Sequence, residues 1–106
     1  MKTAGLTGAA LNWVVTHINY EINGDHIWAT EEEKCNYAED WAQAGPIIER
    51  ERITIQFDGD EIRCDLTTDS GGFFVGSDEI NPLIAAMRCY VASKLGDEVE
   101  IPKELQ

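Results

Sequence analysis

The chain of 106 residues has few basic side chains, with 8 Lys and Arg against 20 Asp and Glu, and its formal net charge is −12. The acidic residues are spread almost evenly along the chain rather than gathered in a tail. Such a surface repels nucleic-acid phosphates over about one Debye length, roughly 10 Å at moderate salt. The composition therefore argues against direct DNA or RNA binding. It suits plain solubility, a basic partner, or mimicry of nucleic acid.

Cysteines and long apolar runs are also scarce. Cys35, Cys64 and Cys89 are odd in number and show no C-x-x-C spacing, and the N-terminal segment has no signal-peptide pattern. We therefore expect reduced thiols in a cytoplasmic protein. No apolar run approaches the roughly 18 residues of a membrane-spanning helix. We expect a soluble protein that makes no membrane contact.

Common catalytic motifs are missing: the chain has no H-E-x-x-H, no P-loop and no G-x-S-x-G. The spacing of His17, His26 and Cys35 matches no zinc pattern, and the run Asp58-Gly59-Asp60-Glu61 lacks the further oxygen ligands of an EF-hand loop. We predict a non-enzymatic role with no cofactor and no metal. A small enzyme of unrecognised class remains an alternative.

A single domain, residues 1–106, is expected because a chain of this length supports one hydrophobic core. The first helix is predicted from about Gly8 to Asn19. Its apolar residues recur at i, i+3, i+4 and i+7, namely at Leu11, Val14, Val15 and Ile18.

The last helix is predicted from Pro82 to Leu95 and carries both boundaries in its own sequence. Asn81 is a good N-cap, Pro82 occupies the position where a missing N–H costs nothing, and Gly96 can close the helix. Its core-facing stripe is expected to consist of Ile84, Met87, Val91 and Leu95, with Leu83 and Tyr90 at its border.

Two alternating apolar runs predict a β-hairpin over about residues 52–66. The apolar positions are Ile53, Ile55 and Phe57, then Ile62, Cys64 and Leu66. A two-residue type I′ turn at Asp58-Gly59 would pair Ile55 with Ile62 and Phe57 with Asp60, which places the apolar side chains on one face.

Weaker signals complete the expected fold. A capping-box sequence at 30–33 predicts a short helix through Tyr37. Gly45-Pro46 is expected to end whatever element precedes these two residues. Residues 73–75 predict a third strand, and residues 99–101 a short edge strand stopped by Pro102. The whole is typical of an α+β fold, in which a small antiparallel sheet packs against an N-terminal and a C-terminal helix.

Four residues are candidate ligand contacts: Trp41, Arg50, Arg52 and Arg88. Trp41 precedes a small-residue segment, while Arg50 and Arg52 lie where the hairpin begins. An aromatic face can stack a planar ring, and an arginine fork can grip a phosphate or carboxylate. The alternative is structural, with Trp41 as a core residue and the two arginines paired with nearby glutamates.

Three stretches carry a family resemblance: Leu6 through Leu11, Asp40 through Glu51, and the segment 81–105, reading NPLIAAMRCYVASKLGDEVEIPKEL. With them the chain resembles the phage NinX-like proteins, although Ala44 stands where that family usually has a glycine pair. The resemblance implies a phage or prophage accessory protein, dispensable for making particles, in the cytoplasm of the bacterial host. It implies an action on host physiology or defence and supplies no catalytic residues.

The leading hypothesis from the sequence is a non-enzymatic phage accessory protein that binds and sequesters a small nucleotide-derived ligand. Its first alternative is an acidic protein-directed inhibitor, or nucleic-acid mimic, acting on a host protein. The sequence leaves open whether the protein forms a homo-oligomer.

Overall fold

A computed structural model of the chain describes residues 2–6, 8–18, 36–68, 71–79, 81–96 and 98–101. Its elements, in chain order, are η1 (Thr3–Gly5), α1 (Gly8–His17), α2 (Trp41–Glu51), β1 (Thr54–Asp58), β2 (Glu61–Thr67), β3 (Phe73–Asp78) and α3 (Pro82–Leu95). The α+β prediction is confirmed. The short helix expected to begin at Thr30 lies outside the described residues, except that Tyr37–Glu39 form a turn.

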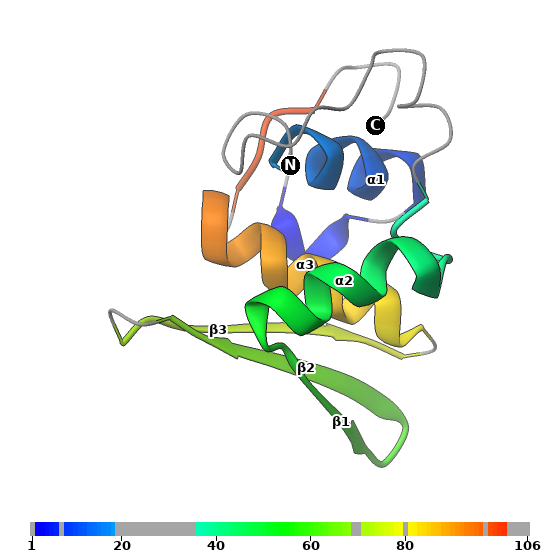
Figure 1. Ribbon diagram of the computed structural model, residues 1–106, viewed down its shortest axis with the longest axis vertical. Coiled ribbons are helices and arrows are strands. Elements are labelled where there is room, and N and C mark those ends of the chain that lie inside the picture. The colour runs from blue at the N-terminus through cyan, green and yellow to red at the C-terminus, as the bar shows by residue number, and fades with distance from the viewer. Residues whose placement is uncertain are drawn as a thin grey trace.

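The elements form layers, with the sheet on one side, α2 and α3 in the middle, and α1 beyond α3 (Figure 1). Helix α3 packs on β2 and β3, and α1 packs on α3. The N-terminal helix therefore does not cover the sheet directly as the sequence had suggested. Because α3 lies between two layers, it is buried on most sides, at Leu83, Ala85, Ala86, Met87, Cys89, Tyr90 and Val91.

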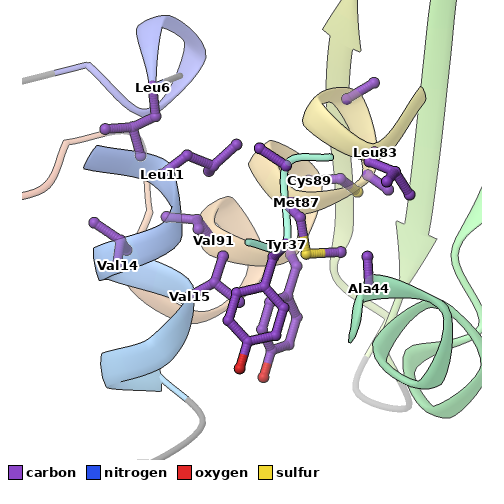
Figure 2. Packing of buried hydrophobic residues seen from close by; sticks show 14 of the residues in the cluster. Leu6, Leu11, Val14, Val15, Tyr37, Ala44, Leu83, Met87, Cys89 and Val91 are labelled. Carbon is purple, nitrogen blue, oxygen red and sulfur yellow. The ribbon is translucent and has the colours of Figure 1, made fainter. Parts of the chain in front are cut away.

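The core fills the space on both sides of α3. Figure 2 shows Leu11 and Val15 of α1 lying on one side of Met87 and Val91, and Ala44 of α2 on the other. All four predicted apolar positions of α1 are buried, which confirms its stripe. Leu95, expected in the stripe of α3, is instead 45% exposed.

The predicted bounds of α3 are confirmed by its caps. The Asn81 side chain accepts a 2.8 Å hydrogen bond from the Leu83 N–H, and the Gly96 N–H donates to the Ala92 carbonyl at 3.0 Å. Gly96 has φ of 86°, in the region that favours glycine. The Asn81 amide also donates to the Ala38 carbonyl at 2.7 Å, so this cap ties the chain before α2 to α3.

The hairpin is confirmed, but its predicted register is wrong. Ile55 pairs with Cys64, Phe57 with Ile62 and Asp58 with Glu61, so the turn residues are Gly59 and Asp60. Gly59 has φ of 63°, whereas Asp60 is not among the described residues with positive φ, which fits a type II′ turn rather than type I′. The shift is by two residues and preserves parity, so the apolar residues still share one face.

Strand β3 continues through Gly76 to Asp78, beyond the predicted end at Val75. A Cβ on Gly76 would lie 2.1 Å from the Ala85 carbonyl oxygen and 2.5 Å from the Cys89 amide nitrogen. The backbones of strand and helix therefore meet at this point, which only glycine allows.

Gly45 and Pro46 lie inside α2 and do not end a helix as predicted. The Asp40 side chain caps α2 by accepting from the Ala42 N–H at 2.9 Å. Pro46 removes one backbone donor from the helix. Burial of Ala44 and Ile47 against the core offsets this loss, so packing overrides the local signal.

The expected edge strand at 99–101 is not formed by the described residues. Lys2 and Glu98 form an isolated antiparallel bridge, and Val99 and Ile101 are buried beside it. The Thr3 hydroxyl donates to the Gly96 carbonyl at 2.7 Å, which also holds the N-terminal segment against the end of α3.

Candidate functional site

The four candidate contacts do not lie together. Trp41 is the first residue of α2 and is 54% exposed, so it is no core residue. Arg50 and Arg52 lie at the other end of the helix, about 13 Å or more along its axis. Arg88 lies on α3 and lines clefts that include none of the other three.

Arg50 is tied to α3. Its Nη2 donates to the Tyr90 hydroxyl at 3.0 Å, and its Nε lies 3.3 Å from the Glu51 carboxylate. Lys94 approaches the same carboxylate at 3.1 Å, and both cations lie about 6 Å from the Tyr90 ring centre, at 6.0 Å and 5.9 Å. This cluster joins α2 to α3, as the structural alternative expected.

Arg52 adopts the left-handed conformation, with φ of 56°, where α2 ends. The Ile53 N–H then donates to the Ile48 carbonyl at 3.0 Å, which starts the path into β1. The Arg52 side chain is exposed and forms no ion pair in the described part of the chain. Its backbone conformation therefore has a clear structural role.

Arg88 joins three segments. Its Nε donates to the Leu6 carbonyl at 2.8 Å, and its Nη1 donates to the Ser77 carbonyl at 2.6 Å and lies 3.3 Å from an Asp78 oxygen. The side chain is only 11% exposed. A cleft of about 280 Å³ on one side is lined partly by Lys2, and one of about 360 Å³ on the other is lined mainly by carboxylates.

Ion pairs neutralise nearly all the cations that the structure describes. Of the six basic residues in the described ranges, five lie within 4.0 Å of a carboxylate; the pairs are Lys2–Glu98, Arg50–Glu51, Arg63–Asp65, Arg88–Asp78 and Lys94–Glu51. Among the described contacts, Asp58, Asp60 and Glu61 at the hairpin tip have no such partner, and all three are exposed. The excess acidity is thus presented to solvent, whereas most of the described cations already have a carboxylate partner.

The hairpin also forms one edge of the sheet, because the strand order is β1-β2-β3. In a hairpin closed by the Asp58–Glu61 pair, alternate residues of β1 turn their N–H and C=O groups away from β2, namely Ile55 and Phe57. None of the described residues hydrogen-bonds these outward groups. The edge is therefore open within the described structure.

Phe57 is 75% exposed, the most of any large hydrophobic side chain among the described residues. It shares the helix-covered face with Ile62, which is buried, but α3 covers β2 and β3 and leaves the end of β1 bare. Sequence alternation assigned Phe57 to the core-facing row. Alternation does not show how far the helices extend over that row, so the exposure of Phe57 could not be predicted.

Cys64 and Cys89 are buried on the inner side of the sheet. The Cys89 thiol donates to the Phe74 carbonyl at 3.3 Å and the Cys64 thiol to the Pro82 carbonyl at 3.8 Å. Burial, with a smaller effect of Asp65, raises the pKa of Cys64 to about 11. Burial, with the nearby Cys64 and Asp65, raises the pKa of Cys89 to about 12. Both stay protonated at neutral pH, which makes them poor nucleophiles.

Other classes of site find no support in the described ranges. No group of three or more His, Cys, Asp or Glu residues is arranged there to hold a metal ion. No described helix is both long enough and apolar enough to cross a membrane. The feature that stands out is the acidic hairpin with its open edge.

Comparison with known proteins gives one clear relationship. A search of curated proteins finds no match. A model of the family described as "Bacteriophage P22, NinX" matches residues 2–94, which run from the N-terminal segment through the described helices α1 and α2 and the sheet to Lys94 of α3. Since this match covers most of the sequence, the chain belongs to the bacteriophage P22 NinX family.

Proposed function

We propose that this phage protein acts by binding a host protein that carries a basic surface, and that it works as a protein-directed inhibitor rather than an enzyme. The observation that supports this proposal is the distribution of charge. Five of the six described cations already have a carboxylate partner, whereas the carboxylates of the hairpin tip are exposed and have no cationic partner among the described residues. Such a surface attracts a basic site and accelerates association with it.

The same distribution weighs against sequestration of a small nucleotide-derived ligand. That hypothesis requires Trp41, Arg50, Arg52 and Arg88 to converge, and they lie at separate places. It also requires cations that are free to hold phosphate, whereas Arg50 and Arg88 already contact carboxylates. A host protein with a nucleic-acid-binding groove is the kind of target that an acidic surface fits.

The test is affinity capture from lysate of the bacterial host at low and high salt, with the bound proteins identified by mass spectrometry. We expect one or a few basic host proteins to bind at low salt and to be lost at high salt, because exposed charges are screened. Recovery of nothing from well-folded protein would contradict the proposal. So would a bound protein whose retention is independent of salt.

A matched pair of variants separates local charge from total charge. Asp58→Asn, Asp60→Asn and Glu61→Gln together remove the carboxylates of the hairpin tip, and the net charge changes from −12 to −9. The control makes the same change in charge at three exposed glutamates elsewhere, Glu39, Glu49 and Glu100. Capture should fall in the tip variant and persist in the control.

The ligand hypothesis has its own decisive experiment. Calorimetric titration with cyclic nucleotides and with NAD-derived compounds should give no heat of binding if the target is a protein. A binding signal that is lost on substitution of Arg88 by methionine, in protein that remains folded, would instead support the ligand hypothesis.

A further inference from the structure

The open edge of β1 provides both parts of a strand-addition site. Backbone groups of Ile55 and Phe57 point away from β2 without a partner among the described residues. The side chains of the same two residues form an apolar row on the helix-covered face, Ile55 half-buried and Phe57 75% exposed. In recognition by strand addition, edge hydrogen bonds supply affinity and alternate side-chain positions supply specificity.

Native proteins usually protect such an edge with a charge that points inward, a proline, a bulge or a covering segment. Strand β1 reads Thr-Ile-Gln-Phe-Asp and places none of the first three devices between Thr54 and Phe57. No described helix packs extensively on β1. Between Thr54 and Phe57 the edge therefore carries no charge, and no described helix covers it extensively, which leaves it accessible to a pairing partner.

The charge around this edge selects the partner. On the other face of the sheet, Thr54, Gln56 and Asp58 alternate with the apolar row. They lie opposite Asp65, Arg63 and Glu61 of β2, and Arg63 is paired with Asp65, so the carboxylates without a described cationic partner are those near the turn. Asp60 adds a third carboxylate at the tip. An incoming strand with Lys or Arg on this face at the turn end of β1 would lie beside Asp58 and close to the other carboxylates of the tip. A second copy of the chain would bring the same carboxylates and a further net charge of −12, which disfavours self-pairing.

We infer that β1 binds an extended segment of a basic partner protein as an added strand, with apolar residues facing Ile55 and Phe57 and Lys or Arg residues on the opposite face. The segment covers about five residues, or roughly 17 Å of extended chain. This inference rests on the proposed function and specifies where and how the partner binds.

The test uses an end-blocked peptide of eight residues in which valine and lysine alternate. Amide hydrogen exchange followed by NMR should slow at Ile55 and Phe57 when the peptide is added, because their outward N–H groups gain acceptors. The amide of Gln56 already points toward β2 and should change little. A peptide with glutamate in place of lysine should give no protection.

Two variants locate the contact. Phe57→Ala should weaken binding of the valine–lysine peptide about tenfold, and Phe57→Leu should largely restore it. Phe73→Ala is the matched control, since Phe73 is 56% exposed but lies on β3, and it should leave binding unchanged. Because Phe57 is mostly exposed, the variants are expected to remain folded.

Different failures have different meanings. If salt-sensitive capture of a host protein succeeds while the peptide, tested up to millimolar concentration, protects neither Ile55 nor Phe57, the strand-addition site is wrong and the proposed function stands. If both experiments fail, both ideas fall. If the two amides are already protected without peptide, and the protection grows with protein concentration, the edge pairs with a second copy and the inference is overturned.

Discussion

The two edge strands of the sheet, β1 and β3, differ in whether another segment of the chain bonds to their outward backbone groups. At the β3 edge, Arg88 donates to the Ser77 carbonyl and to the Leu6 carbonyl, which brings the N-terminal segment beside the strand. At the β1 edge, Ile55 and Phe57 have no such neighbour among the described residues. Arg88 therefore closes the β3 edge at Ser77, although Phe73 and Val75 further along that strand also lack backbone partners among the described residues, whereas the β1 edge has no such contact at all within the described structure.

This difference separates the side of the sheet that stabilises the fold from the side that we propose binds a partner. The closed side combines the strand–helix contact at Gly76, the buried thiols and the Arg88 hydrogen bonds. The open side combines exposed apolar and acidic residues with backbone groups that no described residue bonds. Substitutions on the closed side should reduce the free energy of unfolding, and those on the open side should change binding while leaving stability nearly unaltered.

The largest effect is expected at Gly76. Gly76→Ala places a methyl group 2.1 Å from the Ala85 carbonyl oxygen, so strand and helix must separate, and we expect a loss of about 3 kcal/mol or more in the free energy of unfolding. Gly45→Ala is the control, because its methyl group would meet no atom within 4 Å inside α2. It should stabilise the protein by about 0.5–1 kcal/mol. Urea unfolding measures both, and similar values for the two variants would contradict the packing described.

Loss of Arg88 should be the next most damaging change. Arg88→Met keeps the apolar stem but removes the donors to Leu6 and Ser77, and we expect a loss of about 2 kcal/mol. Arg52→Ala, at an exposed side chain, should change stability by less than about 0.5 kcal/mol. If Arg88→Met is equally mild, the β3 edge is not held closed by this residue.

The buried thiols predict a loss of stability at alkaline pH. Their pKa values are raised from 9.0 to about 11 for Cys64 and about 12 for Cys89, so above pH 9 the unfolded chain releases protons that the folded chain retains. Stability should be unaffected by these groups below pH 9 and fall as pH rises from 9 toward 11, by up to about 1.4 kcal/mol per pH unit for each thiol.

The control for the pH prediction is the same titration on Cys89→Ala. Its stability should decline less steeply between pH 9 and 11 than that of the unaltered protein, when both are measured by chemical unfolding. Parallel curves would show that the thiol ionises as freely in the folded protein as in the unfolded chain.

The smallest effect on stability is expected on the open side. Phe57→Ala removes a side chain that is 75% exposed, so the free energy of unfolding should change by less than about 0.5 kcal/mol. A loss above 2 kcal/mol would show that Phe57 is covered in solution. The open edge would then be an incorrect description of this side.

What the sequence predicted well is local in origin. The bounds of α3 follow from Asn81, Pro82 and Gly96, which act on their own helix. The hairpin face follows from alternation, which survived a register error because the shift was by two residues. The turn itself was misplaced, since Gly59 serves at the first central position as readily as at the second.

What the sequence could not predict depends on contacts between distant segments. The arginines were grouped because Arg50 and Arg52 are neighbours in sequence, but Arg50 turns to Tyr90 and Arg88 turns to Leu6 and Ser77. Gly45-Pro46 was expected to break a helix that tertiary packing sustains. Nor does alternation reveal that the helices stop short of Phe57.

Amide hydrogen exchange in the free protein tests the contrast between the two edges most directly. The account predicts that the amides of Ile55 and Phe57 exchange at nearly the rate of an unprotected chain. Those of Thr54 and Gln56, which point toward β2, should be protected. Protection of Ile55 and Phe57 equal to that of Gln56 would mean that the β1 edge is covered, and would contradict the account.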